Sequence, residues 1–301
     1  MMRIIQKRKY AYWFSGILTA ASLILIVLWG FKLGIDFKGG TLSEARFAID
    51  PSPSVSAIEE RLSALNLKSL TVQPTDNKGV LLRYLASDEN ANEQVLAALR
   101  SLDPNITQLR TDFIGASVSS QIKKQAFWGT LLAVIGIALY IAWSFRRVSG
   151  IVTSWEYGFG AVIALVHDIL IVAGLFVILG RYSGVEIGVP FIAALLTILG
   201  YSVNDTIVVY DRVRENLLRS RQKEDFEIVV NRSVNETLVR SINTSLTVFI
   251  TLLAIVIFGG ESIRYFGVAL LIGVVFGTYS SIYIASALLV TRYKMKIGSN
   301  S

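Results

Sequence analysis

An aspartate in the fourth apolar segment is the first residue of this sequence that could do chemistry. Asp205 follows Asn204, and the apolar stretch continues through residues 206–210 before the next charges. Ionisable side chains inside a transmembrane segment are costly, and by default they indicate function. A carboxyl group with little water around it can bind and release a proton. We therefore expect a proton-binding site at Asp205, supported by Asn204. The alternative is a helix that ends early and leaves Asp205 in water.

A polar stripe begins at the start of the fifth apolar segment. Its members stand at helical offsets of 0, 3, 4, 7 and 11, and they are Arg240, Asn243, Thr244, Thr247 and Thr251. Such a one-sided stripe faces protein or water rather than lipid. An arginine side chain does not lose its charge in practice. We therefore expect Arg240 to pair with Asp205 and to hold or release its charge. The alternative is an ordinary flanking charge at the membrane surface.

Two further features lie inside apolar segments. The third segment carries the adjacent pair His167 and Asp168, which could either relay protons or fix helix packing by hydrogen bonds. The sequence leaves both roles open. In the last segment, small residues recur every four positions, at Ala269, Gly273, Gly277, Ser281 and Ala285. This spacing is typical of a helix-packing face.

Several kinds of chemistry are excluded. The chain has no cysteine and one histidine, so neither a cysteine-ligated metal nor a multi-histidine site can form. It has no P-loop motif for nucleotide phosphates. We expect no enzyme activity, no metal and no cofactor, with protons as the coupling ion. A proton that crosses the membrane potential supplies about 2.3 kcal/mol per 100 mV.

The elements that must position these residues are transmembrane helices. Of the 301 residues, 53% are hydrophobic and 17% are charged, against about 25% charged in soluble domains. Six runs reach the roughly 20 apolar residues that a bilayer requires. They cover about residues 11–31, 125–145, 158–180, 188–210, 240–260 and 265–290. The first run is too long for a signal peptide and has no cleavage site after it, so we expect a retained anchor.

Lysine and arginine predict the orientation of the helices. The basic residues gather in four segments on one side, at Arg3, Lys7, Arg8, Lys9, Arg146, Arg147, Arg212, Arg214, Arg219, Arg221, Lys223, Arg232, Arg292, Lys294 and Lys296. The short loops on the other side hold only Arg181 and Arg264. We therefore expect both termini and a mostly helical loop at about 211–239 in the cytoplasm. The net charge of +7 reflects this topology, and we expect no nucleic-acid partner.

The long segment between the first two runs is then outside the cytoplasm. Residues 32–124 predict strands at 41–49, 70–74, 80–85 and 106–114, helices at 54–65 and 88–102, and a turn at 76–79. The order β-α-β-β-α-β is that of a ferredoxin-like domain. A glycine-rich connector with Asp36, Gly39 and Gly40 precedes it. The predicted protein thus comprises residues 1–31, a small α+β domain at 32–124, and a bundle at 125–301.

Three motifs together resemble a known family. They are GIDFKGGT at residues 34–41, the His167–Asp168 pair, and GYSVNDTIVVYDRVREN at residues 200–216. In order and topology the sequence closely resembles the SecF family, the smaller membrane subunits of the SecD–SecF accessory of the Sec translocase. The resemblance spans nearly the whole chain, and the motif at 200–216 is the most specific.

The resemblance implies a function and a setting. The fold would be a six-helix, RND-like half that pairs with SecD in the bacterial inner membrane. The complex would promote late steps of protein export with proton motive force, and the family's membrane carboxylate and arginine fall on Asp205 and Arg240. Implied partners are SecD, the SecYEG translocon, the unfolded exported polypeptide and, as a further candidate, YajC. Two other functions compete: an RND-type exporter of small molecules or lipids, and a purely structural assembly factor.

Overall fold

The computed structural model describes residues 1–75, 77–85, 90–146, 152–220 and 224–298, and these form two compact units. One unit comprises residues 33–126, and the other comprises residues 1–32 and 127–301. Some of the sequence predictions fall outside the described residues, at position 76 of the predicted turn, positions 88–89 of the predicted helix at 88–102, Arg147, Arg221 and Lys223.

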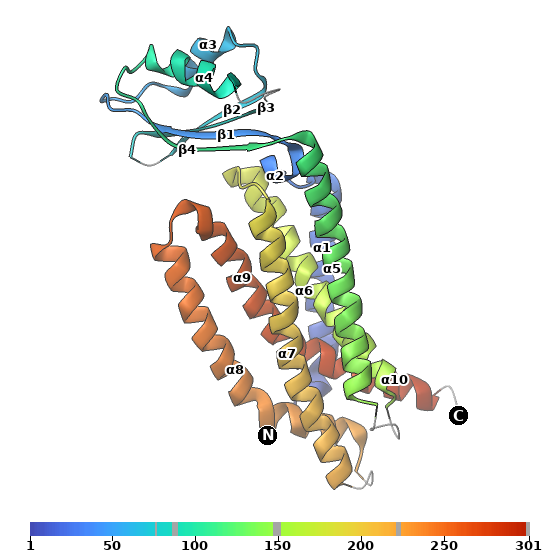
Figure 1. Cartoon of the computed structure of the whole chain (residues 1–301). Coiled ribbons are helices and arrows are strands. Elements are labelled where there is room, and N and C mark those ends of the chain that lie inside the picture. Colours follow the sequence, from blue (N-terminus) through green and yellow to red (C-terminus); the bar gives the residue numbers. More distant parts are fainter. Residues whose placement is uncertain (76, 86–89, 147–151, 221–223, 299–301) are drawn as a thin grey trace. The chain divides into compact units, whose positions relative to one another are not determined.

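The smaller unit is an antiparallel sheet with two helices on one face. Its elements in chain order are α2 (Ile35–Lys38), β1 (Gly40–Arg46), α3 (Val55–Ser63), β2 (Lys68–Thr75), β3 (Gly79–Leu85), α4 (Asn90–Arg100) and β4 (Thr107–Ile114). The strands are ordered β2-β3-β1-β4 and every neighbouring pair is antiparallel, as Figure 1 shows. The predicted β-α-β-β-α-β domain is therefore confirmed.

Alternating apolar residues build the core of this unit. Buried side chains of the strands, such as Leu82 and Val80, pack against Leu62 of α3 and Leu99 of α4. The hydroxyl of Ser54 accepts a hydrogen bond of 3.2 Å from the Ala57 backbone N–H, so Ser54 caps α3. This cap satisfies one of the free donors at the start of the helix.

A buried aspartate anchors the turns beside this core. Asp103 accepts hydrogen bonds from the backbone N–H groups of Ala48, Ile49 and Asn105 at 2.5, 3.2 and 3.0 Å. Burial raises the pKa of this carboxyl group, but the three N–H donors outweigh it and leave the pKa of Asp103 below its ordinary value. The carboxylate thus ties the chain after β1 to the chain before β4.

The glycine-rich connector is one helical turn followed by two glycines. The chain passes through α2 and then through Gly39 and Gly40, whose φ angles are +76° and +119°. A Cβ atom on Gly40 would lie 2.7 Å from the Tyr84 carbonyl oxygen on β3. Both the backbone angle and the close approach of β3 therefore require glycine at position 40.

We expect Gly40→Ala to destabilise the smaller unit by about 1–3 kcal/mol, the usual cost of a strained backbone position. Gly115→Ala is the matched control, because a Cβ atom there meets nothing within 4 Å. Thermal unfolding of the purified chain, followed by a fluorescent probe attached to this unit, measures both variants. Equal stability of the two variants would contradict the assignment of strain to Gly40.

The larger unit is a bundle of long helices. They are α1 (Arg8–Trp29) with a preceding turn at Ile5–Lys7, α5 (Ala116–Ser144, which belongs to this unit from Phe127 onward), α6 (Ser154–Ser183), α7 (Val189–Arg219), α8 (Phe226–Phe258), α9 (Glu261–Ser280) and α10 (Ser286–Gly298). A π-helical turn, Ser281–Ala285, joins α9 and α10 without a break, so they count as one span. Six helices among the described residues are long and apolar enough to cross a membrane, which confirms the predicted six spans.

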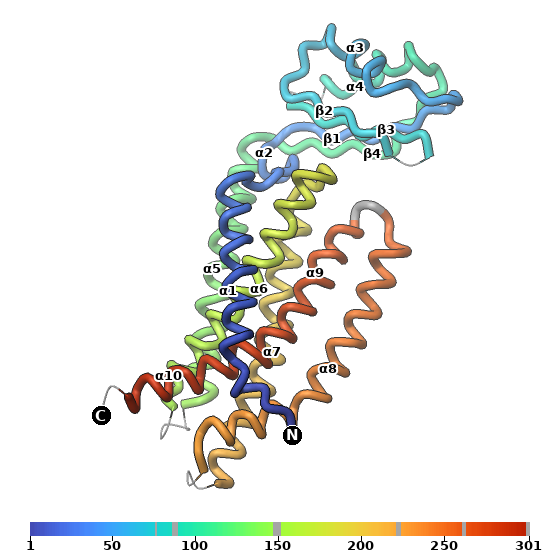
Figure 2. The backbone as a smooth tube through the Cα atoms, turned by 180° about the vertical axis from the view of Figure 1, so that it is seen from behind, coloured from blue at the N-terminus to red at the C-terminus, as the bar shows by residue number. Residues whose placement is uncertain are grey.

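Helices α6, α7 and α9 form the middle of the bundle. Helix α7 packs on α8 and α9, and α6 packs on α1 and α9; Figure 2 shows α1 alongside α6. An aromatic cluster lies within the core, where the ring centroid of Tyr157 is 4.9 Å from that of Phe145 and 5.1 Å from that of Tyr210. The Tyr210 hydroxyl donates a 3.2 Å hydrogen bond to the Ala285 carbonyl, which ties α7 to the π-helical turn.

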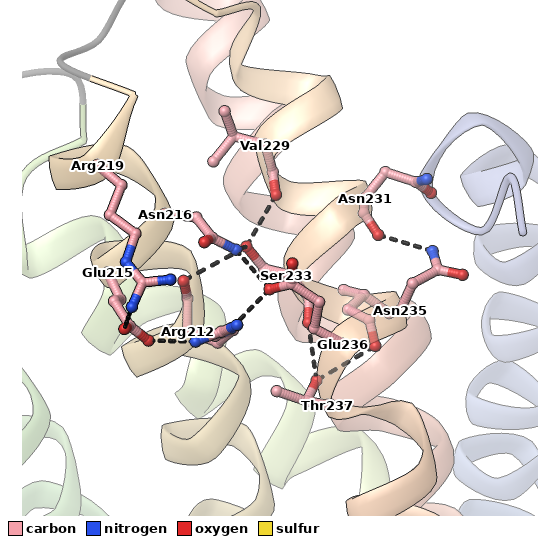
Figure 3. A network of polar contacts seen from close by, with 11 residues as sticks. Arg212, Glu215, Asn216, Arg219, Val229, Asn231, Ser233, Asn235, Glu236 and Thr237 are labelled. Carbon is pink, nitrogen blue, oxygen red and sulfur yellow. Dashed lines mark hydrogen bonds and ion pairs between the residues drawn. The ribbon is translucent and has the colours of Figure 1, made fainter. Parts of the chain in front are cut away.

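The helices α7 and α8 continue beyond their apolar runs into a polar hairpin. Figure 3 shows the contacts that join them: Arg212 binds Glu236 at 2.6 Å, and Asn216 donates to Ser233 at 3.0 Å. Arg219 binds Glu215, four residues before it, at 2.6 Å. Pairs at this spacing support a helix in water. The loop predicted at 211–239 is thus mostly the paired ends of two transmembrane helices.

Candidate functional site

Asp205 lies buried among three helical elements. Its side chain belongs to α7, and the residue is only 8% exposed. Ser241 of α8 donates a hydrogen bond of 2.6 Å to one carboxyl oxygen, and Ser281 of the π-helical turn donates to the other. The carboxyl group therefore links α7, α8 and the last span through hydroxyl donors.

A second buried carboxyl group, that of Asp168, also accepts hydrogen bonds from serine hydroxyls. Asp168 of α6 is fully buried, and one of its oxygens lies 2.9 Å from Nδ1 of His167. Its other oxygen accepts hydrogen bonds from Ser202 of α7 at 2.6 Å and from Ser280 of α9 at 2.7 Å. Among the described residues, neither Asp168 nor Asp205 forms an ion pair with lysine or arginine.

The two carboxyl groups share neighbouring residues on two helices. Ser202 and Asp205 stand three positions apart on α7, so they lie on the same face of that helix. Ser280 and Ser281 are consecutive, and each serves a different carboxyl group. The π-helical turn begins at Ser281, and the hydroxyl of Ser286 donates to the Ser281 carbonyl at 2.8 Å. Single π-helical turns are frequent at functional sites.

The predicted ion pair between Asp205 and Arg240 is not formed. Arg240 is exposed, and among the described residues it has no carboxylate within ion-pairing distance. The reason is helical geometry: Arg240 directly precedes Ser241, and consecutive residues point about 100° apart around a helix axis. When Ser241 faces Asp205, Arg240 must point to another side of α8.

The rest of the predicted stripe is exposed together with Arg240. Asn243, Thr244, Thr247 and Thr251 all lie on the outer side of α8 in this chain. The threonine hydroxyls donate to carbonyls of their own helix, at 2.9 Å from Thr244 to Arg240. Asn204 of α7 is also exposed. Helix α8 therefore presents the guanidinium group of Arg240 and the amide group of Asn243 on a surface that no described part of this chain covers.

The small residues of the last span let its backbone approach α7 closely. A Cβ atom on Gly273 would lie 2.3 Å from Ile198, and one on Gly277 would lie 3.0 Å from Ser202. Ser281, which we assigned to this packing face, also donates to Asp205. Close packing thus brings Ser280 and Ser281 to the two carboxyl groups.

Sequence reasoning did not identify serine hydroxyls as the donors to Asp205 and Asp168, and it assigned Ser281 to helix packing alone. Ser241 and Ser245 stand four residues apart on the buried side of α8, and Ser245 contacts Tyr201 and Thr278. A second polar row beside the Arg240 stripe was the available signal, but serine is small enough to be expected in any helix contact. Among the described residues, no group of three His, Asp or Glu could hold a metal ion.

The fold and this site define a class: a multi-pass membrane protein with six spans, buried carboxyl groups and a small α+β domain after the first span. Residues 94–295 match the family described as protein export membrane protein SecD/SecF, C-terminal, and residues 27–48 match the SecD/SecF GG motif. The chain belongs to the SecD/SecF family of protein-export membrane proteins.

Individual relatives agree with this assignment. The chain is 43% identical to protein translocase subunit SecF of Thermobaculum terrenum, over 97% of this chain and 94% of that protein. It is 38% identical to SecF of Sebaldella termitidis, over 97% and 93% of the two chains. The crystal structure of SecDF from Thermus thermophilus matches with a TM-score of 0.83 and 32% identity, over 96% of this chain. This chain spans 38% of that longer chain.

Proposed function

We propose that this chain uses proton motive force to promote protein export as an accessory subunit of the Sec translocase. Asp205 is the proton-binding group in this proposal. The supporting observation is that its buried carboxyl group accepts hydroxyl hydrogen bonds from two other helical elements. An ionised carboxylate only accepts hydrogen bonds, whereas a protonated one also donates. Binding a proton would therefore change the bonds that join α7, α8 and the last span.

The exposed stripe on α8 supports a membrane partner. A charged side chain that faces lipid is costly, and such groups normally face protein. The partner in the proposal is SecD, because the SecDF chain from Thermus thermophilus contains a region matching this chain and much additional sequence. Arg240 would then face that partner and pair with a carboxylate there. SecYEG, the unfolded exported polypeptide and YajC are further proposed partners.

The proposed location is the bacterial inner membrane, with both termini in the cytoplasm. The lysine and arginine asymmetry supports this orientation. Residues 33–126 would then lie outside, where the exported chain emerges, and helix movements would move this unit as a lever. The unit is small for a dedicated small-molecule pocket, which favours export of polypeptide over RND-type efflux.

Pulse-labelling in cells that lack their own SecF tests this function. We expect the chain, produced together with its SecD, to speed maturation of a secreted precursor several-fold while the proton gradient is intact. A protonophore should remove that gain, and the control is the same cells without the chain. Equal stimulation with the gradient dissipated would contradict the proton coupling, and no stimulation in either state would contradict the export role.

A further inference from the structure

His167 is a buried base with one ring nitrogen left unpaired. It is the chain's single histidine and is only 6% exposed. Nδ1 faces Asp168 at 2.9 Å, whereas Nε2 has no hydrogen-bond partner among the described residues. The imidazole ring stacks on the ring of Tyr279, with 6.2 Å between centroids. A buried polar atom without a partner requires an explanation, because no hydrogen bond in the protein replaces the hydrogen bonds to water that it loses on burial.

The surroundings of the imidazole determine which nitrogen can take up a proton. Asp168 already accepts hydroxyl hydrogen bonds from Ser202 and Ser280 on one oxygen. When Asp168 is ionised it can only accept hydrogen bonds, so the hydrogen shared with His167 then belongs to Nδ1. Nε2 then carries the lone pair. In this tautomer the unpaired atom is an acceptor, which is less costly to bury than an unpaired N–H donor.

We propose that His167 is a second proton-binding site of the bundle, with Nε2 as the atom that accepts the proton and Asp168 as the group that stabilises the resulting imidazolium. The step is a simple protonation: Nε2 gains one hydrogen ion from water, Nδ1 keeps its hydrogen, and the negative charge of Asp168 balances the new positive charge. A carboxylate that orients a histidine and stabilises its charged form acts in this way in enzyme active sites.

The groups that surround the His167–Asp168 pair agree with this role. Helix α6 supplies His167 and Asp168, α7 supplies the Ser202 hydroxyl, and α9 supplies the Ser280 hydroxyl and the Tyr279 ring. Helix α1 packs along α6 and supplies Ser15, whose hydroxyl donates to the Tyr279 hydroxyl at 3.2 Å. Among the described residues, protonated His167 would be the only cation against Asp168. With Asp168 ionised, the His167–Asp168 pair is therefore neutral overall only when His167 has bound its proton.

Consecutive serines connect this site to Asp205. Ser280 donates to Asp168 and Ser281 donates to Asp205, so neither hydroxyl can move far without disturbing its neighbour. Ser202 and Asp205 add a second link through α7. Because coupling between two binding sites is reciprocal, proton binding at either site should alter binding at the other. Only this coupling rests on the proposed function, while proton binding by His167 does not.

The single histidine allows a direct test by nitrogen NMR. The chain would be labelled with ¹⁵N-histidine, purified with a tag that contains no histidine, combined with unlabelled SecD, and placed in lipid bilayers. We expect the neutral ring to carry its hydrogen on Nδ1, and Nε2 to become protonated as the pH falls. The His167→Gln variant, which should lose the signal, identifies it. A ring that stays neutral, or stays charged, across the range in which the complex is folded would overturn the proposal.

Variants of Asp168 and of Ser280 test the two parts of the proposal separately. In Asp168→Asn, the fraction of protonated His167 at a given pH should fall at least several-fold. In Ser280→Ala, the signal should still titrate but should no longer respond to Asp205→Asn. Thr197→Ala, which alters an exposed hydroxyl that donates to the Ala193 carbonyl of its own helix, is the control. An unchanged titration in Asp168→Asn would overturn the role of Asp168. Failure of Asp205→Asn to affect export would instead contradict the proposed function and leave the titration of His167 intact.

Discussion

Asp205→Asn should leave the protein folded and inserted at normal levels but reduce its stimulation of export to that of cells without the subunit. Asparagine has nearly the shape of aspartate and can still accept a hydroxyl hydrogen bond from Ser241, but it cannot gain or lose a proton. The hydroxyl of Ser281 can turn to meet the amide. The variant therefore removes titration while it keeps most of the packing among α7, α8 and the last span.

The matched control is Asp211→Asn on the same helix. Asp211 is exposed and lies 3.5 Å from Arg214 in a surface pair, and such pairs contribute little to stability. We expect this variant to support export at the wild-type rate. Pulse-labelling of a secreted precursor, with protein levels measured on the same membranes, distinguishes the two. Normal proton-dependent export in Asp205→Asn would refute the mechanism, and loss of the protein itself would favour a structural role.

Gly273→Leu should produce the largest structural effect of any single substitution considered for this bundle. The new Cβ atom alone would lie 2.3 Å from the Ile198 side chain, in a contact that extends to Gly277 against Ser202 one turn later. Overpacking of a close contact typically costs about 1–3 kcal/mol. The last span must move away from α7, and this movement would carry Ser280 and Ser281 away from the two carboxyl groups.

The measurements for Gly273→Leu are thermal unfolding in detergent and the amount of protein in the membrane. We expect a lower unfolding temperature and little or no stimulation of export. Gly136→Leu on α5 is the control, because a Cβ atom at that glycine meets nothing within 4 Å. If both variants unfold at the same temperature, the close approach of α7 and α9 does not limit stability.

The fold could be predicted from the sequence because its main signals are local. An apolar run of about 20 residues must be a span in lipid, since backbone groups there have to be paired within a helix. In the smaller unit, Leu82 and Val80 show the alternation of a strand with one buried face. The ends of the helices were less predictable. Helix α7 continues to Arg219 because charged side chains pair along its polar end, which hydropathy does not detect.

The site was predicted only in part. The burial of Asp205 followed from its apolar neighbours, but the partners of its carboxyl group did not. A stripe at helical offsets shows that Arg240 shares a face with Asn243 and Thr244, but it does not reveal which helix, if any, that face contacts. Ser241 and Ser281 donate to Asp205 across helices separated by 36 and 76 residues in sequence. Such contacts depend on how the helices pack against one another, and the pattern of residues within a single helix does not reveal that packing.

Infrared difference spectroscopy of the complex in lipid bilayers tests the central claim most directly. Aspartate residues of this chain would carry a ¹³C label in the side-chain carboxyl group, and spectra would be compared between high and low pH. The account predicts a protonated-carboxyl band that grows as the pH falls and is missing from Asp205→Asn. The absence of any Asp205-dependent band, over the pH range in which the wild-type complex drives export, would contradict the account.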